Sequence, residues 1–442
     1  MSRQSHPAIE RIRSAIQGIS FSSGTVKVPV EFCELYYKPD PAKRNAETLN
    51  LADATDEQLN RLISVCEAAP FGRGTESVMD ESYRKALKLE LSQFSTPFDL
   101  AATGILYRIQ QDLVDTYSTL RRMIRAEPYK LNVYSEKHTN SVINTRLKPH
   151  SDKGAFFKQH KDTPRAENMF GSLVLVFPTA HEGGNLILTQ NGQGWTFDAP
   201  RLLTGSTPMS PEVAYIAFYS DTTHEVKPVT SGARVTLTYN LYFDNFGTNL
   251  QSDVPDLSIA KYSAVKEALK ELLDDSNTFG KPYEKTRLCF GLSHGYPVSR
   301  GGESSATYKV SELSKYLKGS DAVLYRVCKD LGLDTDLRVL YRDEKDPDYP
   351  KSFFGEDFFE DFKDPDSERG IEDQCTDMEK FTSRTSNRLL LWVTNCTGLT
   401  GAVSHYIAYG NEPSNAKTYG EVCIFARRPP QEVASDEEDM YY

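Results

Sequence analysis

The chain of 442 residues contains no run of about 18 consecutive apolar residues, the length that a membrane-spanning helix needs. Its first twenty residues also lack the apolar core of a signal peptide. Ile9, Ile12, Ile16 and Ile19 instead recur at the spacing of one helix face. These absences predict a protein that is neither inserted into a membrane nor secreted.

Cysteine is scarce, and its pattern excludes two kinds of small domain. The seven cysteines are odd in number, widely scattered, and form no CxxC pair. This pattern argues against a disulfide framework and against a zinc knuckle, and it predicts reduced thiols in a cytoplasmic or nuclear protein. The residues concerned are Cys33, Cys66, Cys289, Cys328, Cys375, Cys396 and Cys423.

Positive charge is also in short supply. The net charge of −11 argues against sequence-independent nucleic-acid binding, which needs a basic surface. A Walker phosphate loop is absent, so an NTPase function has no support. Hydrophobic residues nevertheless make up 39% of the chain, which is enough for a core in two domains or one large one.

The order of apolar patterns predicts an α+β protein with a strand-rich centre. Short apolar segments without intervening helices fill residues 129–243, and Gly183-Gly184 and Asn191-Gly192 mark turns between them. Such a series predicts an antiparallel sandwich or barrel-like sheet. The expected divisions are an N-terminal mixed region 1–128 with a bracing helix 101–126, a core 129–245, a C-terminal α/β region 246–430 and an acidic tail 431–442.

Histidine is rare as well, which makes a metal-site pattern easy to find among only eight residues. An iron site with open positions takes two histidines and one carboxylate. His160 and Asp162 form a His-x-Asp pair, and residues i and i+2 of a strand point to the same side. His224 follows on a distant segment of strand character. The three side chains are therefore the predicted metal ligands.

A second His-x-Asp pair, His150 and Asp152, competes with the first. It follows Pro149 in a polar stretch that is typical of a loop. His160 instead follows the apolar run GAFF and precedes a strand-like segment. We therefore favour His160 and Asp162 over this rival pair.

The surrounding residues resemble a known superfamily. The features that match are Gly154 before His160, the His-x-Asp pair, the Gly183-Gly184 turn, His224, and Arg234 ten residues after His224. With these features residues 129–243 resemble the Fe(II)- and 2-oxoglutarate-dependent dioxygenases of the prolyl 4-hydroxylase-like branch, especially its uncharacterised fungal members.

The resemblance implies a double-stranded β-helix (jelly-roll) core with buttressing helices and an α/β C-terminal extension. It also implies Fe(II), 2-oxoglutarate as co-substrate and ascorbate as auxiliary reductant. The expected reaction is hydroxylation of an unactivated C–H bond with release of succinate and carbon dioxide. The substrate would be a peptide, a protein or a small metabolite.

Two residues are expected to hold the co-substrate. Arg234 suits the distal carboxylate of 2-oxoglutarate, because a guanidinium binds a carboxylate through two hydrogen bonds. Tyr134 matches a tyrosine that the family often has ahead of the glycine of GAFF. Residues 135–153 then form an insertion between Tyr134 and Gly154, which we expect at the substrate entrance.

Two alternatives remain open. The chain could be a jelly-roll scaffold or binding protein without catalysis, although an intact metal triad argues against it. It could also be a cupin-type metalloenzyme that does not use 2-oxoglutarate, in which case Arg234 would have no role.

Overall fold

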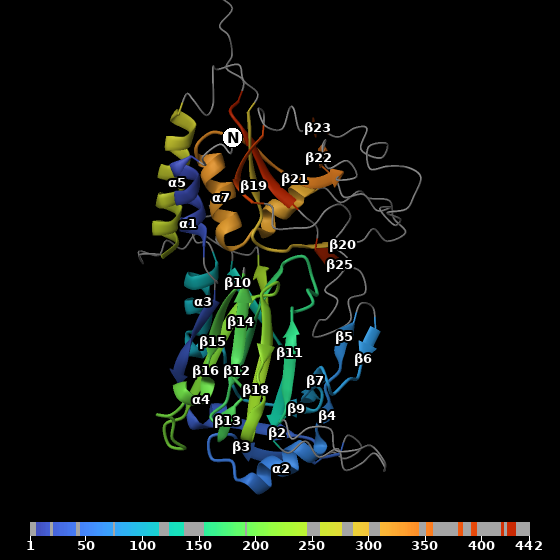
Figure 1. The fold of residues 1–442 in the computed structure, drawn as a ribbon. Coiled ribbons are helices and arrows are strands. Elements are labelled where there is room, and N and C mark those ends of the chain that lie inside the picture. Colours follow the sequence, from blue (N-terminus) through green and yellow to red (C-terminus); the bar gives the residue numbers. More distant parts are fainter. Residues whose placement is uncertain are drawn as a thin grey trace, which may run out of the picture.

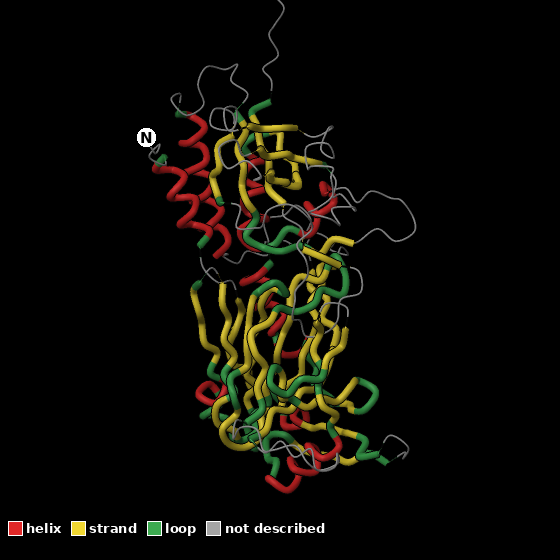
Figure 2. Tube along the Cα trace, turned by 45° about the vertical axis from the view of Figure 1, so that its right-hand side comes forward, coloured by secondary structure: helices red, strands yellow, loops and turns green. Residues whose placement is uncertain are grey.

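The protein is described by a computed structural model. The described residues are 6–17, 21–40, 45–73, 76–114, 123–136, 154–190, 192–244, 257–275, 286–299, 310–343, 351–356, 379–382, 390–395, 417–419 and 422–429. Figures 1 and 2 both show a strand-rich region with a smaller region of helices and strands at one end. The chain therefore has a mixed α+β architecture, as the sequence predicts.

The strand-rich region is built on two antiparallel sheets. In the described residues the larger sheet has the order β1-β16-β12-β18-β10-β8-β4, with β13 paired to β18. The smaller sheet has the order β15-β14-β17-β11-β7. The larger sheet comprises β1 (Phe21–Lys27), β4 (Glu67–Ala68), β8 (Leu87–Glu90), β10 (Met123–Ser135), β12 (Met169–Val176), β13 (His181–Gly183), β16 (Glu212–Tyr219) and β18 (Val229–Asp244). The smaller comprises β7 (Arg84–Lys85), β11 (Phe156–His160), β14 (Leu186–Gln190), β15 (Gln193–Phe197) and β17 (Thr223–Val226).

Successive strands cross between these two sheets. β10, β12, β16 and β18 lie in the larger sheet, whereas β11, β14 and β17 lie in the smaller one. Each crossing requires a turn, and the predicted glycine turn supplies one, since Gly183 and Gly184 have φ values of 72° and 68°. Both angles lie in the left-handed region that favours glycine. The two sheets thus enclose a space lined by strands that are far apart in sequence.

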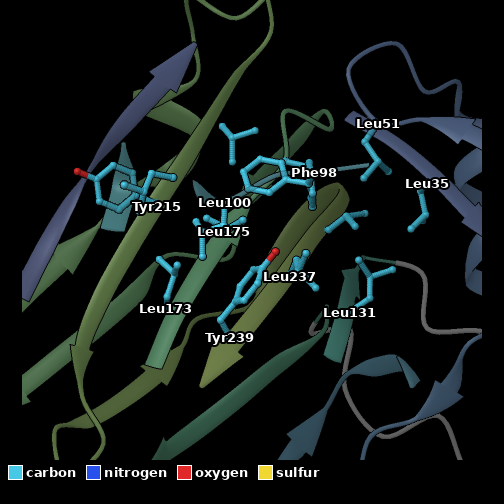
Figure 3. Close-up of a cluster of buried hydrophobic side chains, with 14 of the residues drawn as sticks. Leu35, Leu51, Phe98, Leu100, Leu131, Leu173, Leu175, Tyr215, Leu237 and Tyr239 are labelled. Carbon is cyan, nitrogen blue, oxygen red and sulfur yellow. The ribbon is translucent and has the colours of Figure 1, made fainter. Parts of the chain in front are cut away.

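The central strands of the larger sheet are buried on both faces. Because side chains alternate along a strand, Leu131, Leu173, Leu175 and Leu237 share one face. Figure 3 shows these leucines together with Phe98 and Leu100, which come from the preceding N-terminal segment. The opposite face carries polar residues such as Asn132 and Thr236, which line the space between the sheets. One face is therefore core and the other is available for a site.

The N-terminal region supplies strands and short helices to this framework. The helix α2 begins with a reciprocal capping box between Thr55 and Gln58. The helices and 3-10 turns here are η1 (Val30–Cys33), α2 (Asp56–Val65), η2 (Ala101–Thr103), α3 (Ile105–Leu113) and, later in the chain, α4 (Ala199–Leu202). The smaller strands are β2 (Glu34–Tyr37), β3 (Glu47–Asn50), β5 (Phe71–Arg73), β6 (Glu76–Val78) and β9 (Phe94–Ser95).

The prediction of one long helix over residues 101–126 is wrong. The helix α3 ends at Leu113, and Val114 already has extended backbone angles. Residues 123–126 belong instead to β10, where Ile124 pairs with Phe243 of β18. The apolar spacing of this stretch fits a helix, but pairing with a long central strand overrides that local preference.

The second region holds a sheet with the order β23-β22-β21-β26-β19-β24, covered by α1, α5 and α7. The N-terminal helix α1 contacts α5 and β24, so the two ends of the chain meet here. The elements are α1 (Pro7–Ile16), α5 (Leu257–Asp274), β19 (Arg287–Gly291), β20 (Pro297–Ser299), η3 (Val310–Tyr316), α7 (Gly319–Asp330), β21 (Asp334–Asp343), β22 (Lys351–Gly355), β23 (Glu379–Thr382), β24 (Leu390–Thr394), β25 (Lys417–Tyr419) and β26 (Val422–Arg427). Among the described residues, no helix is long and apolar enough to cross a membrane.

Candidate metal centre

The smaller sheet brings the two predicted histidines side by side. His160 ends β11 and is paired in register with His224 of β17. A register shift between Phe157 and His160 places both rings on the inner side, with their centroids 4.2 Å apart. Both residues are 5% exposed. Two histidines that are 64 positions apart in the sequence thus lie side by side on paired strands.

Each histidine is oriented by the backbone. The Nδ1 atom of His160 lies 2.8 Å from the carbonyl oxygen of Lys158, and that of His224 lies 2.9 Å from the carbonyl oxygen of Thr222. Since a carbonyl only accepts, both Nδ1 atoms donate, and both Nε2 atoms keep a lone pair. Histidines that bind metals are oriented in this manner.

The carboxylate completes the cluster. Asp162 is buried, and its Oδ1 lies 3.8 Å from the Nε2 of His224. Its Oδ2 accepts a hydrogen bond from the hydroxyl of Ser172 on β12. One ligand atom each from His160, Asp162 and His224 lies within 4.8 Å of the others. Two imidazole nitrogens and one carboxylate oxygen form the donor set of a non-haem iron site.

Burial also sets the protonation of His160. Removal from water, followed by the proximity of His224, lowers the pKa of His160 well below its ordinary value. The ring of Phe157 stacks on it, with centroids 3.5 Å apart, and the guanidinium carbon of Arg84 lies 4.3 Å from the Phe157 ring centroid. His160 is therefore neutral near neutral pH, as a metal ligand must be.

Arg234 lies on β18, in the sheet opposite the histidines. It is 1% exposed, and its Nε and Nη2 atoms are buried without a hydrogen-bond partner among the described residues. Burial lowers its pKa to about 10, so it still carries its charge at neutral pH. Buried polar groups are almost always paired, and an unpaired guanidinium indicates an anionic ligand that belongs beside it.

Two neighbours shape the surroundings of Arg234. Tyr134 of β10 is its cross-strand partner, and its ring centroid lies 5.5 Å from the guanidinium carbon. Gly184 lies against the arginine side chain, and a Cβ at this position would come within 2.8 Å of its Cδ. The glycine turn therefore makes room for Arg234.

The two groups of side chains line one open cavity. Arg234 and the metal cluster both line it, as does Tyr134. The complete lining is Arg84, Tyr129, Lys130, Asn132, Tyr134, Phe157, His160, Asp162, Val174, Leu186, Phe218, His224, Val226, Arg234, Thr236 and Thr238. Arg234 and the metal cluster therefore face the same cavity.

The residues present fit iron and 2-oxoglutarate. The metal position has the expected donor atoms, and the two Arg234 nitrogens without a partner among the described residues suit a carboxylate inside the same cavity.

Several other residues that the sequence singles out lie outside the described part of the chain. The rival His150 and Asp152, most of the 135–153 insertion, and His405 lie outside the described residues. Ser135 and Glu136, which begin the insertion, leave the larger sheet at the Arg234 end of the cavity.

Further residues outside the metal cluster also have defined contacts. Arg165 donates to the hydroxyl of Tyr129 over 2.9 Å, and Trp195 packs on Phe21 with ring centroids 3.8 Å apart. His181 lies in β13, where burial lowers its pKa to about 4.

Sequence reasoning missed Ser172 and Arg84. Ser172 is a lone polar residue on an apolar strand, and its alternation with Val174 could have placed it on the inner face. Arg84 donates to the carbonyl of Pro70 and to the side chain of Asn132. It is the first residue of a strand of two residues, for which the sequence gives no comparable signal.

A family model and several solved structures match the chain. Residues 142–242 match the model of the 2OG-Fe(II) oxygenase superfamily. No curated protein matches significantly. A prolyl-4-hydroxylase from Pseudomonas putida is 16% identical, covers 53% of this chain and 98% of its own, and has a TM-score of 0.28.

Two more structures are comparable. A 2OG-Fe(II) oxygenase family oxidoreductase from Burkholderia pseudomallei is 15% identical over 57% of this chain and 98% of its own, with a TM-score of 0.25. A Trichoplax adhaerens prolyl hydroxylase was solved in complex with a peptide fragment of hypoxia inducible factor. It is 14% identical, the match covers 55% of this chain and 94% of its own, and the TM-score is 0.25. The family match confirms the resemblance to Fe(II)- and 2-oxoglutarate-dependent oxygenases, and it covers the segment of this chain that carries the metal cluster and Arg234.

Proposed function

We propose that the protein is an Fe(II)- and 2-oxoglutarate-dependent oxygenase that hydroxylates an unactivated C–H bond of a peptidyl or amino-acid-like substrate. The observation that carries this proposal is the guanidinium of Arg234, whose Nε and Nη2 are buried without a partner among the described residues, in the same cavity as His160, Asp162 and His224. When bound, iron and 2-oxoglutarate supply the oxidising power, with oxygen consumed and succinate and carbon dioxide released.

The residues of the chain have separate tasks in this proposal. His160, Asp162 and His224 hold the metal on one side, which leaves its other positions for ligands. Arg234 binds the distal carboxylate of 2-oxoglutarate, and Tyr134 packs beside it. Phe157, Val226 and Leu186 line the cavity between them and exclude water.

The proposed fold is a double-stranded β-helix. The support is the alternation of successive strands between the two sheets, with the metal cluster on one sheet and Arg234 on the other. The proposal of a peptidyl or amino-acid-like substrate rests on the resemblance of residues 129–243 to the prolyl 4-hydroxylase-like branch of these oxygenases.

The assay that tests this proposal measures succinate formation from 2-oxoglutarate with Fe(II), ascorbate and oxygen. Peptides and amino acids are added as candidate substrates that would increase the rate. We expect succinate in the complete mixture and none when a chelator removes the iron. A protein that binds cobalt but forms no succinate with any tested substrate would favour the scaffold alternative. A protein that consumes oxygen without 2-oxoglutarate would favour the cupin-type alternative.

A further inference from the structure

A buried polar cluster joins the C-terminal region to the turn between β16 and β17. Asp221 of this turn accepts a hydrogen bond from the Nζ of Lys318 over 2.5 Å and from the backbone amide of Gly295 over 3.0 Å. The Nδ1 of His294 lies 3.3 Å from the same carboxylate. Asp221 therefore has three contacts to the C-terminal region.

The C-terminal partners are themselves held in place. Asp321 accepts hydrogen bonds from the backbone amides of Ser293 and His294, at 2.8 and 3.0 Å, and from the hydroxyl of Tyr296 at 2.9 Å. The Tyr296 hydroxyl in turn accepts from the backbone amide of Lys318 over 3.1 Å. The groups that contact Asp221 thus form one connected network.

Because this network is buried, the charge of Asp221 depends on its partners. The side chains of Asp221, His294 and Lys318 are 8%, 3% and 2% exposed. Burial by itself would raise the pKa of Asp221, yet Lys318 and His294 hold that pKa well below its usual range. A carboxylate buried this deeply retains its charge only while its partners are present.

The other side of the same turn faces the metal cluster. The carbonyl oxygen of Ser220 accepts a hydrogen bond from the backbone amide of Asp162 over 3.0 Å. The carbonyl oxygen of Thr222 orients His224 through its Nδ1. Asp221 lies between these two residues and points its side chain to the C-terminal region. The turn of residues 220–222 therefore contacts two metal-site residues on one side and the polar network on the other.

We propose that Lys318 and His294 are positioning residues of the metal centre, which act through Asp221 by fixing the turn that orients Asp162 and His224. The inference rests on the proposed metal site. It gives the C-terminal region a role in the activity, because an oxygenase core without that region would lack the anchor of this turn. Neither residue touches the cavity that holds the metal cluster.

The test is a titration of the metal-free, full-length protein with Co(II), followed by its visible absorption. Co(II) accepts the same mixture of nitrogen and oxygen ligands as Fe(II). Groups that orient metal ligands typically change metal affinity by tenfold or more. We expect Lys318→Met to weaken Co(II) binding about tenfold and to alter the absorption spectrum of the bound ion, which reports ligand geometry.

The matched control is Leu272→Ala, which makes a cavity in the same C-terminal core and removes no side chain of the polar network. Both substitutions should lower the melting temperature, whereas only Lys318→Met should weaken Co(II) binding. Since Lys318→Met leaves a buried charge unpaired, the double variant Asp221→Asn with Lys318→Met provides the same test without that charge.

Unchanged Co(II) affinity and spectrum in both Lys318 variants, with a melting temperature lowered as in Leu272→Ala, would overturn the proposal. His160→Ala separates this failure from failure of the metal site. If His160→Ala also binds Co(II) as tightly as the unmodified protein, the metal site itself is wrong.

Discussion

Single hydrogen bonds determine how the side chains of the metal cluster are aimed. The two histidines donate to carbonyl groups two residues earlier, and Asp162 accepts from Ser172. These contacts exist in the polypeptide itself, so the ligands are oriented before a metal arrives. Their loss should therefore affect metal affinity more than folding.

Replacement of Ser172 by alanine tests this orientation. Without the hydroxyl, Asp162 loses a partner for Oδ2, and we expect metal affinity to fall by about tenfold. Ser22→Ala is the matched control, because Ser22 is also buried and donates to a carboxylate, that of Asp112, away from the cavity. Co(II) titration of both variants provides the measurement. Equal affinities would remove Ser172 from the metal site.

In the proposed function, Arg234 and the space around it recognise the co-substrate. Loss of one partner of a buried charge pair costs about 2–5 kcal/mol. Arg234→Ala should therefore raise the 2-oxoglutarate concentration needed for half-maximal turnover more than tenfold, with little change in metal affinity. An unchanged requirement would remove Arg234 from the site.

Gly184→Ala tests the same contact with the arginine retained. The added Cβ would meet the Arg234 side chain, so we expect a raised 2-oxoglutarate requirement. Gly192→Ala is the control, since it shares the positive φ but meets nothing within 4 Å. Both substitutions should cost about 1–2 kcal/mol of backbone strain. If the two variants need the same 2-oxoglutarate concentration, the close contact at Gly184 has no functional effect.

At the level of secondary structure, the position of β11 relative to β18 brings the site together. Gly154 lies two residues before β11, and a Cβ there would come within 1.7 Å of the carbonyl oxygen of Val229. The backbone amide of Val229 donates to the carbonyl of Ala155 over 3.0 Å. The two segments can approach this closely because residue 154 has no side chain.

Gly154→Ala should therefore disturb the start of β11. Forcing extra atoms into a packed site typically costs about 1–3 kcal/mol, so we expect a lower free energy of unfolding in denaturant titrations. Metal affinity should fall too, because β11 carries His160. Gly205→Ala is the control, since it meets nothing within 4 Å. Equal stability of the two variants would contradict the close packing of Gly154.

Local patterns predicted strands better than they predicted long-range pairing. The alternating and apolar segments between residues 129 and 243 are strands, and the His-x-Asp spacing led to the metal cluster. The helix prediction over residues 101–126 failed because the partner that turns residues 123–126 into a strand is more than a hundred residues away. A register of this kind leaves no signal in one sequence.

At the scale of the whole molecule, the contact between the two regions was not predictable. Asp221, His294 and Lys318 are up to 97 positions apart. None has a neighbour in sequence that marks it as buried. Their pairing depends on the packing of the C-terminal region against the end of the larger sheet, which only the tertiary structure reveals.

This contact predicts a specific dependence of stability on pH. The folded pKa of Asp221 lies below its value in an unfolded chain, about 3.9. Its contribution to stability is therefore complete above that pH and is lost as the pH falls toward the folded pKa. Burial raises the pKa of Asp321, whose contribution has the opposite sign.

Asp221→Asn separates the contribution of Asp221 to stability from that of Asp321. We expect the metal-free variant to be about 3–5 kcal/mol less stable than the unmodified protein at neutral pH, because Lys318 loses its charged partner. The difference should shrink as the pH falls below about 4. Denaturant titrations across this range measure it. A difference that stays constant with pH would contradict the assigned role of Asp221.

The most direct test of the whole account is succinate formation from 2-oxoglutarate by purified protein with Fe(II) and oxygen. We expect turnover that disappears in His160→Ala, Asp162→Ala and His224→Ala and persists in His150→Ala, because the cavity is lined by the first three side chains. Loss of turnover in His150→Ala together with full turnover in His160→Ala would contradict the metal centre described above.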